Sequence, residues 1–164
     1  MQGEAAAGVA HLRQALASPD VGPESLRAYW LATLAEAYGR AGQPQAGLQV
    51  LAEAVTLMAT TEARWWEAEV SRLQGELLLH LPSPAVPQAE AAFLRALEVA
   101  RYQQAKALEL RAACSLSRLR HQHGQREAAR DLLAPLYAWF TEGFDTPDLQ
   151  EAKTLLAALE PAGK

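Results

Sequence analysis

Apolar residues recur along almost the whole chain at the three- and four-residue spacing that places them on one face of an α-helix. A clear example is the stripe formed by Leu31, Leu34, Ala35 and Tyr38, with polar residues among the intervening positions. The pattern breaks where Pro, Gly and capping residues gather, which is typical of helix ends. The sequence therefore predicts eight helices, at residues 3–17, 23–41, 44–59, 62–80, 87–102, 104–122, 125–141 and 147–159.

Particular residues set the boundaries of these predicted helices. Pro23 and Pro147 suit the first position of a helix, where the missing backbone N–H of proline has no partner to lose. Thr60 and Thr61 are predicted to cap the start of the fourth helix. Three prolines within residues 82–87 cannot continue a helix, so they predict a loop before the fifth.

Small and large residues also alternate in a way that repeats along the chain. In the first complete helix pair, Ala35, Gly47 and Ala54 are small where two helices should touch, and Leu51 is large. The same spacings recur, less regularly, at residues 113–136. Small residues let helix axes approach, and each pair leaves an apolar side that only the next pair can bury. This is the pattern of the tetratricopeptide repeat (TPR).

The resemblance to TPR proteins implies an all-α fold, a right-handed α-solenoid of TPR-like antiparallel helix pairs. We expect one domain spanning residues 1–164, with about eight helices that end in a C-terminal capping helix. Its predicted parts are a half-repeat at 1–20, complete repeats at 23–59, 62–102 and 104–141, and the capping helix at 147–159.

Residues 60–159 also resemble the C-terminal repeat region of large bacterial regulatory proteins, in which an AAA-like or signal-transduction ATPase module precedes the repeats. Some of these regulators carry nucleotide-cyclase or winged-helix domains as well. The resemblance implies partner binding or control of an attached ATPase, and it supplies no catalytic residues. Because no ATPase or cyclase sequence is present, we expect either a fragment or a shortened relative of such a regulator. The segments that carry the resemblance are residues 72–79, 89–93, 104–106, 132–137 and 140–146.

Composition narrows the class of protein. Hydrophobic residues make up 50% of the chain and charged residues 21%, which excludes a disordered segment. Ala and Leu dominate and Ile is absent, which favours helix over strand. The absence of Asn and the excess of Arg over Lys indicate a bacterial source. A formal net charge of −4 gives no general attraction to nucleic acid or to an anionic membrane.

The single cysteine, Cys114, has no intramolecular disulfide partner, which favours a reducing compartment. The residues after Met1 do not resemble a signal peptide, and no stretch reaches the roughly 20 apolar residues that a membrane-spanning helix needs. We therefore expect a soluble, cytoplasmic protein with no membrane partner.

No motif for catalysis or cofactor binding stands out. The chain has no glycine-rich phosphate loop and no dinucleotide fingerprint. Glu76 and His80 share a helix face, but a zinc or di-iron site needs more ligands at paired spacing. An isolated helical cysteine such as Cys114 usually packs as a small hydrophobe. We predict no catalytic residue, no cofactor and no metal, and hence a protein–protein interaction module rather than an enzyme.

The TPR resemblance implies that the first helix of each pair lines a concave groove. A mixed-charge lining of this kind suits a protein partner that offers a peptide or helix with charges of both signs. The register predicts the groove residues Tyr29, Glu36 and Arg40 on the first pair, Glu69, Arg72, Glu76 and His80 on the second, and Arg111, Cys114, Arg118 and His121 on the third.

Two alternatives remain open at this point. The first helix lacks a partner helix of its own, so an exposed end of the stack could join two copies in a homodimer. Residues 101–130 are rich in arginine and offer contact with nucleic acid, although we expect these arginines to be solvated and see no interleaved aromatic platform beside them. Trp65 and Trp66 are adjacent and cannot both face inward on a helix, so one is expected at an edge.

Overall fold

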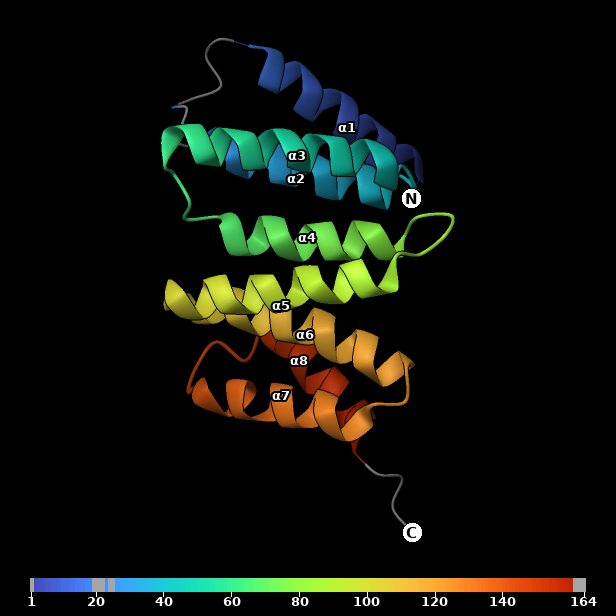
Figure 1. The fold of residues 1–164 in the computed structure, drawn as a ribbon, viewed down its shortest axis with the longest axis vertical. Helices are drawn as coiled ribbons and strands as arrows, with labels where there is room; N and C mark the ends of the chain where they lie inside the picture. The colour runs from blue at the N-terminus through green and yellow to red at the C-terminus, as the bar shows by residue number, and fades with distance from the viewer. Residues whose placement is uncertain (1, 19–22, 24–25, 161–164) are drawn as a thin grey trace.

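The computed structural model describes residues 2–18, 23 and 26–160, and in this part of the chain it is all-helical, with no strand. The predicted all-α class and the eight helices are therefore confirmed (Figure 1). In chain order the helices are α1 Gln2–Ala17, α2 Arg27–Arg40, α3 Pro44–Thr61, α4 Glu67–Leu79, α5 Val86–Tyr102, α6 Lys106–Gln122, α7 Arg126–Trp139 and α8 Pro147–Leu159. None of these helices combines the length and the apolar character needed to cross a bilayer.

The helices are stacked along the long axis of the molecule, each packed against its neighbours in sequence (Figure 1). The even-numbered helices also touch one another, α2 against α4, α4 against α6, and α6 against α8. No comparable contact joins α3 to α5 or α5 to α7 among the described residues. The even-numbered helices thus form a continuous row, whose outer surface we call the even-helix face.

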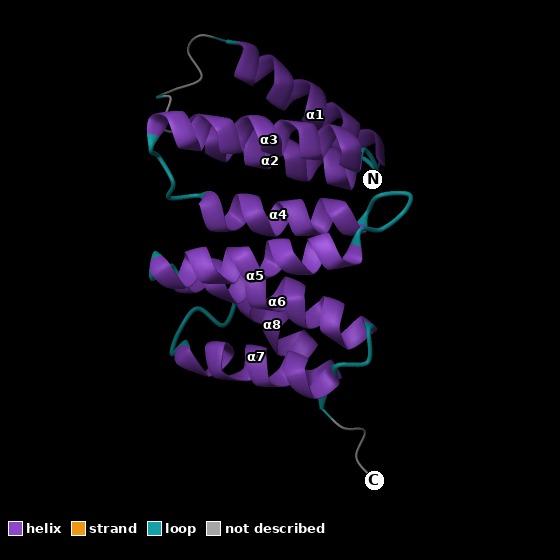
Figure 2. Ribbon diagram, in the orientation of Figure 1, coloured by secondary structure: helices purple, strands orange, loops and turns teal. Residues whose placement is uncertain are grey.

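The connections between helices lie on two opposite edges of the stack (Figure 2). One edge, the turn edge, carries the connections from α2 to α3, α4 to α5 and α6 to α7. Two of these turns need glycine, because Gly42 and Gly124 have φ angles of 73° and 76°, which side chains disfavour. The other edge carries the connections from α3 to α4, α5 to α6 and α7 to α8.

Small residues sit at the tightest helix contacts, as the repeat pattern predicts. Ala35 and Ala54 are fully buried. A Cβ added to Gly47 would lie 2.9 Å from Cδ1 of Leu77, and one added to Gly75 would lie 2.4 Å from Cε1 of the buried Phe93. These glycines therefore allow α3 to approach α4, and α4 to approach α5, more closely than alanine would.

The predicted start of the fourth helix is wrong. Thr60 and Thr61 belong to α3, and both hydroxyls donate to the Leu57 carbonyl, so they do not cap α4. Glu62 follows in the left-handed conformation, with φ 56°, and ends the helix. Trp65 and Trp66 consequently lie in the turn that precedes α4, rather than on the helix itself.

The predicted start of the second helix is also wrong, because α2 begins at Arg27 and Pro23 is not helical. Residues 19–22, between the first two predicted helices, lie outside the described residues. The other helix ends agree with the predictions within two residues. At the far end of the stack, Nε of Arg126 donates to the Leu159 carbonyl at 2.8 Å, which joins α7 to the end of α8.

Candidate interaction site

A cleft opens on the even-helix face and takes side chains from all four even-numbered helices. Its larger hollow, of about 380 Å³, is lined by Glu36, Arg40, Arg72, Arg111, Cys114, Ser115, Arg118, Pro147, Asp148 and Glu151. A second hollow of about 240 Å³ shares Glu36, Arg40, Arg72 and Arg118 with the first and extends to His80. We treat the two hollows as one feature, the even-helix cleft.

The floor of the cleft is built around Arg72 on α4. Its guanidinium binds Glu69 in a bidentate arrangement, with Nε 3.0 Å from Oε2 and Nη2 2.7 Å from Oε1. Nη1 lies 3.4 Å from Oε1 of Glu76. The three residues fall on one face of α4 because they are spaced by three and four positions. Arg72 therefore lies between two carboxylates of its own helix.

Two arginines of α6 extend this arrangement across three helices. Nη2 of Arg111 is 2.7 Å from Oε1 of Glu69 on α4, and its Nη1 is 4.0 Å from Oδ1 of Asp148 on α8. Two helical turns further along, Nη1 of Arg118 is 3.2 Å from Oε1 of Glu76, and its Nη2 donates to Glu151 on α8. Arg111 and Arg118 thus each bridge α4 and α8. We call this set the charge ladder: Glu69, Arg72 and Glu76 on α4, Arg111, Ser115 and Arg118 on α6, and Asp148 and Glu151 on α8.

Ser115 lies between Arg111 and Arg118 on α6. Its hydroxyl donates to Oε1 of Glu76 at 2.6 Å, and Nη1 of Arg72 lies 3.4 Å from its oxygen. A hydroxyl at this point serves as donor and acceptor at once, which a methyl group cannot do. Ser115 therefore connects the α4 part of the ladder to α6.

The ladder keeps Arg72 charged in spite of its burial. The side chains of Arg72 and Glu69 are only 11% and 3% exposed. Burial acts to lower the pKa of Arg72, but the hydrogen bond and the charge of Glu69 outweigh it, so that the pKa lies above its usual value. Buried charges are tolerated only where partners of this quality replace the lost water. The charges at the floor of the cleft are therefore paired within the chain.

Cys114 lies in the wall of the cleft, but its thiol is not activated. The residue is buried, and this burial raises the pKa of the thiol to about 12. At neutral pH the group is therefore a thiol, whereas nucleophilic attack and metal ligation require the thiolate. Within the described part of the chain, no three His, Cys, Asp or Glu side chains are grouped so that they could hold a metal ion.

All but two of the predicted groove residues come together at the cleft, either in its lining or directly behind it. Glu69 lies behind the lining as a partner of Arg72. His80 is exposed at one end, with Nδ1 2.7 Å from the Glu76 carbonyl. Tyr29 instead packs on Trp30, Trp65 and Trp66, and His121 lines neither hollow.

Sequence reasoning missed the contribution of α8. Asp148 and Glu151 line the cleft, although α8 was expected only to cap the stack. Their three-residue spacing places both carboxylates on one helix face, which is the same signal that identified the charged face of α4. The role of Ser115 had no such signal, because its partners come from another helix.

Most arginines of residues 101–130 bind acceptors within the chain, and several of them are partly exposed as well. Arg101 and Lys106 both donate to the buried Glu109, at 2.8 and 2.6 Å. Arg120 lies 3.8 Å from Glu90 of α5. Arg111 and Arg118 bind carboxylates of α4 and α8, and Arg126 donates to carbonyls at the end of α8. The acids that pair with this stretch come largely from other helices and cannot be seen by reading the stretch alone.

Comparison with known proteins finds no matching family model, no matching curated protein and no matching solved structure. The functional interpretation therefore depends on the geometry of the cleft.

Proposed function

We propose that this chain is a non-catalytic protein–protein interaction module of the TPR kind, which receives a peptide or helix in the even-helix cleft. The observation that carries the proposal is that one hollow is lined by α2, α4, α6 and α8 together. In a TPR-like, right-handed stack these are the first helices of the repeats and the capping helix, which face the inside of the superhelix. A cytoplasmic bacterial regulator is the setting that the sequence resemblance favours.

The distribution of exposed charge indicates what such a partner would contact. The inner charges of the ladder already have partners, whereas the walls of the cleft offer charges that are still open to solvent. On the α2 wall the side chain of Arg40 is 72% exposed, and on the α8 wall those of Asp148 and Glu151 are 39% and 50% exposed. A partner with charges of both signs therefore complements the two walls, while the ladder provides the floor.

A pair of charge reversals tests this proposal. The double variant Arg40→Glu and Asp148→Lys reverses one charge on each wall and leaves the net charge unchanged. The matched control, Arg130→Glu and Glu127→Lys, makes the same exchange at exposed positions of α7 that do not line the cleft. The probes are fluorescein-labelled helical peptides with Lys and Glu alternating at four-residue spacing, titrated at low salt and followed by anisotropy.

We expect the wall variant to bind these peptides at least about tenfold more weakly than the wild type, a loss of about 1.4 kcal/mol. The control should bind like the wild type. Equal affinity of wall variant and wild type would overturn the proposal, and so would a wild type that binds none of the peptides. Light scattering over a range of concentrations addresses the alternative of a homodimer, because a dimer that blocks peptide binding would assign the cleft to self-association.

The structure offers little support for the hypothesis that residues 101–130 bind nucleic acid. Most of the basic side chains there already have intramolecular acceptors, so that only part of their charge is available to phosphates. Binding of nucleic acid derives much of its free energy from cations that neutralise phosphates and release counterions. We therefore propose a protein partner for this module.

A further inference from the structure

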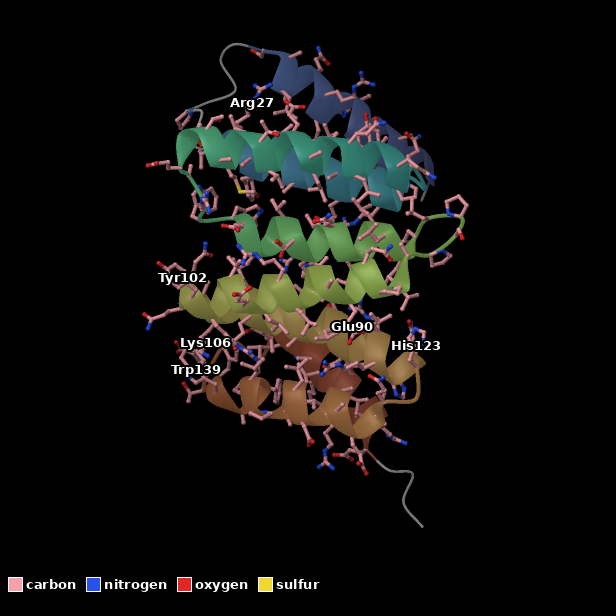
Figure 3. All side chains as sticks on the ribbon, viewed as in Figure 1. Arg27, Glu90, Tyr102, Lys106, His123 and Trp139 are labelled. Carbon is pink, nitrogen blue, oxygen red and sulfur yellow. The ribbon has the colours of Figure 1, made fainter. Side chains whose placement is uncertain are left out.

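The exposed apolar side chains gather on the edge opposite the turn edge. Of the seven large hydrophobic side chains that are exposed in the described residues, five lie where an even-numbered helix begins or an odd-numbered helix ends: Leu26, Trp65, Tyr102, Trp139 and Phe144. Tyr102 is the extreme case, at 91% exposed. In Figure 3, Tyr102, Lys106 and Trp139 follow one another down this side of the stack, while Glu90 and His123 lie toward the other. We call Trp65, Tyr102, Trp139 and Phe144 the aromatic edge.

Several of these rings are held in place by other rings. Trp65 stacks on Tyr29, with ring centres 6.1 Å apart and planes 20° from parallel. Trp139 packs edge-on against Phe140 at 5.1 Å, and Phe144 packs against Tyr137 at 5.8 Å. Nζ of Lys106 lies 5.9 Å from the ring centre of Trp139. Since ordered rings lose little conformational entropy on binding, an exposed edge of this kind is well suited to a partner.

Arg101 and Lys106, which both pair with Glu109, are exposed on the same side of the stack as Tyr102 and Trp139. Arg101 and Lys106 are 56% and 36% exposed at their side chains, whereas the carboxylate of Glu109, which both of them bind, is only 4% exposed. A molecule that approaches this part of the edge therefore meets two cations with their shared counter-charge buried beneath them. The local surface favours carboxylates on the partner.

A hollow of about 360 Å³ adjoins Tyr102. It is lined by Tyr102, Gln103, Val99 and the charged side chains of Arg64, Glu67, Arg95 and Glu98. Nε2 of Gln103 donates to the Arg64 carbonyl at 2.7 Å, which fixes the orientation of the amide. A segment bound beside Tyr102 therefore meets a hollow whose charged side chains are of both signs.

We propose that the aromatic edge is a second interaction surface, which binds a segment of a partner protein that carries both apolar anchors and carboxylates. The anchors pack on Tyr102 and Trp139, and the carboxylates meet Arg101 and Lys106. Aromatic and arginine side chains are the residues that most often dominate the energy of protein interfaces.

Two other occupants fit the edge less well. Nucleic acid would also stack on the rings, but tight binding usually needs several phosphates neutralised, and the chain has a net charge of −4. A second copy that paired through the same edge would bring Arg101 and Lys106 toward their own counterparts, and like charges at an interface oppose association. A protein segment with carboxylates has neither disadvantage.

The test uses the full chain and a labelled peptide of about twelve residues, long enough when extended to cross several packed helices. In this acidic probe Leu and Trp alternate with Glu, and a matched probe has Lys in place of each Glu. The edge variant is Tyr102→Ala with Trp139→Ala. The control variant, Val55→Ala with Leu94→Ala, removes two apolar side chains that are 50% and 47% exposed but lie within α3 and α5, away from the edge.

We expect the acidic probe to bind the wild type and the control equally, and the edge variant at least about tenfold more weakly. The lysine probe should bind the wild type at least about tenfold more weakly than the acidic probe. The cleft variant Arg40→Glu and Asp148→Lys should keep full affinity for the acidic probe, so the failure of one surface is distinguishable from the failure of the other.

Several results would overturn the inference: no binding of the acidic probe to the wild type, equal binding by the edge variant, or equal binding of the lysine probe. An oligothymidylate that binds more tightly than the acidic probe, and that loses binding in the edge variant, would assign the edge to nucleic acid instead. A concentration-dependent mass in light scattering that disappears in the edge variant would assign it to a second copy of the chain.

Discussion

The charge ladder and the aromatic edge depart in opposite directions from the usual distribution of residues between interior and surface. In the ladder, Arg72 and Glu69 are charged side chains that the fold buries. At the edge, Tyr102 and Trp139 are large rings that the fold leaves in water. Buried polar groups and exposed apolar groups are the two kinds of exception that call for a physical reason.

The difference lies in where each group finds its partner. The charges of the ladder are satisfied by other members of the same chain, so their contribution is already present in the free protein. The rings of the edge keep apolar area exposed, and burying such area releases roughly 25 cal/mol per Å². The ladder should therefore matter mainly for the stability of the stack, and the edge mainly for binding. Substitutions in each region test whether the ladder acts on stability and the edge on binding.

The largest effect is expected from Arg72→Met, which removes the central cation of the ladder. Glu69 and Glu76 would each lose a donor, and breaking a buried ion pair by removing one partner costs about 3–5 kcal/mol. Urea denaturation followed by circular dichroism measures the loss. The matched variant Arg95→Met removes a 52% exposed arginine with two carboxylate partners, and it should cost less than about 1 kcal/mol. Equal losses in the two variants would show that the ladder does not stabilise the stack.

A smaller effect is expected at Glu109, which lies beneath the cations of the edge. Burial acts to raise the pKa of this carboxyl, but the hydrogen bonds and charges of Lys106 and Arg101 outweigh it and hold the pKa below its usual value. A lowered pKa stabilises the folded state above the unfolded value of about 4.3, and this contribution is lost as the pH falls through the folded value.

Glu109→Gln should therefore lower the free energy of unfolding at pH 7 by about 1 kcal/mol, discounted because both cations are partly exposed. The difference from wild type should shrink as the pH is lowered below about 4, where the wild-type carboxylate is itself protonated. Urea denaturation at a series of pH values measures both quantities. A difference that stays constant down to acid pH would contradict the assignment of the effect to ionisation.

Much of this architecture follows from local patterns, and the rest does not. The eight helices were predictable because Leu31, Leu34 and Tyr38 recur at helical spacing and because Gly42 and Gly124 mark turns. The turn that holds Trp65 was not, because α3 continues through Thr60 and Thr61 and ends in a left-handed residue, Glu62, which has no special helix-ending character.

In the candidate site, too, local spacing predicts the face on which a residue lies but not its partner on another helix. Glu69, Arg72 and Glu76 share a face by spacing alone, so their position on the cleft was predictable. Arg111 and Arg118 are each 42 positions from the α4 carboxylate that they bind, and Glu151 is 33 positions from Arg118. Only the packing of α4, α6 and α8 decides which carboxylate meets which guanidinium. The aromatic edge likewise depends on which helix ends share a side of the stack.

A further test concerns the exposed end of the ladder. Glu151→Gln removes a carboxylate that is 50% exposed and whose partner, Arg118, keeps Glu76. The cost should be below about 1 kcal/mol and should decrease with added salt, because exposed ion pairs are screened. Urea denaturation at low and high salt measures it. A salt-independent loss of several kcal/mol would mean that the α8 contact is as strong as the buried part of the ladder.

The smallest effect on stability is expected at the aromatic edge itself. Tyr102→Ala removes a side chain that is 91% exposed at the last residue of α5, so the free energy of unfolding should change by no more than about 0.5 kcal/mol. Tyr38→Ala is the matched comparison, because it deletes the same side chain from a position only 8% exposed, and it should cost about 3–5 kcal/mol. If Tyr102→Ala instead destabilises the chain by more than about 1 kcal/mol, the ring contributes to folding, and its exposure no longer argues that it is kept for a partner.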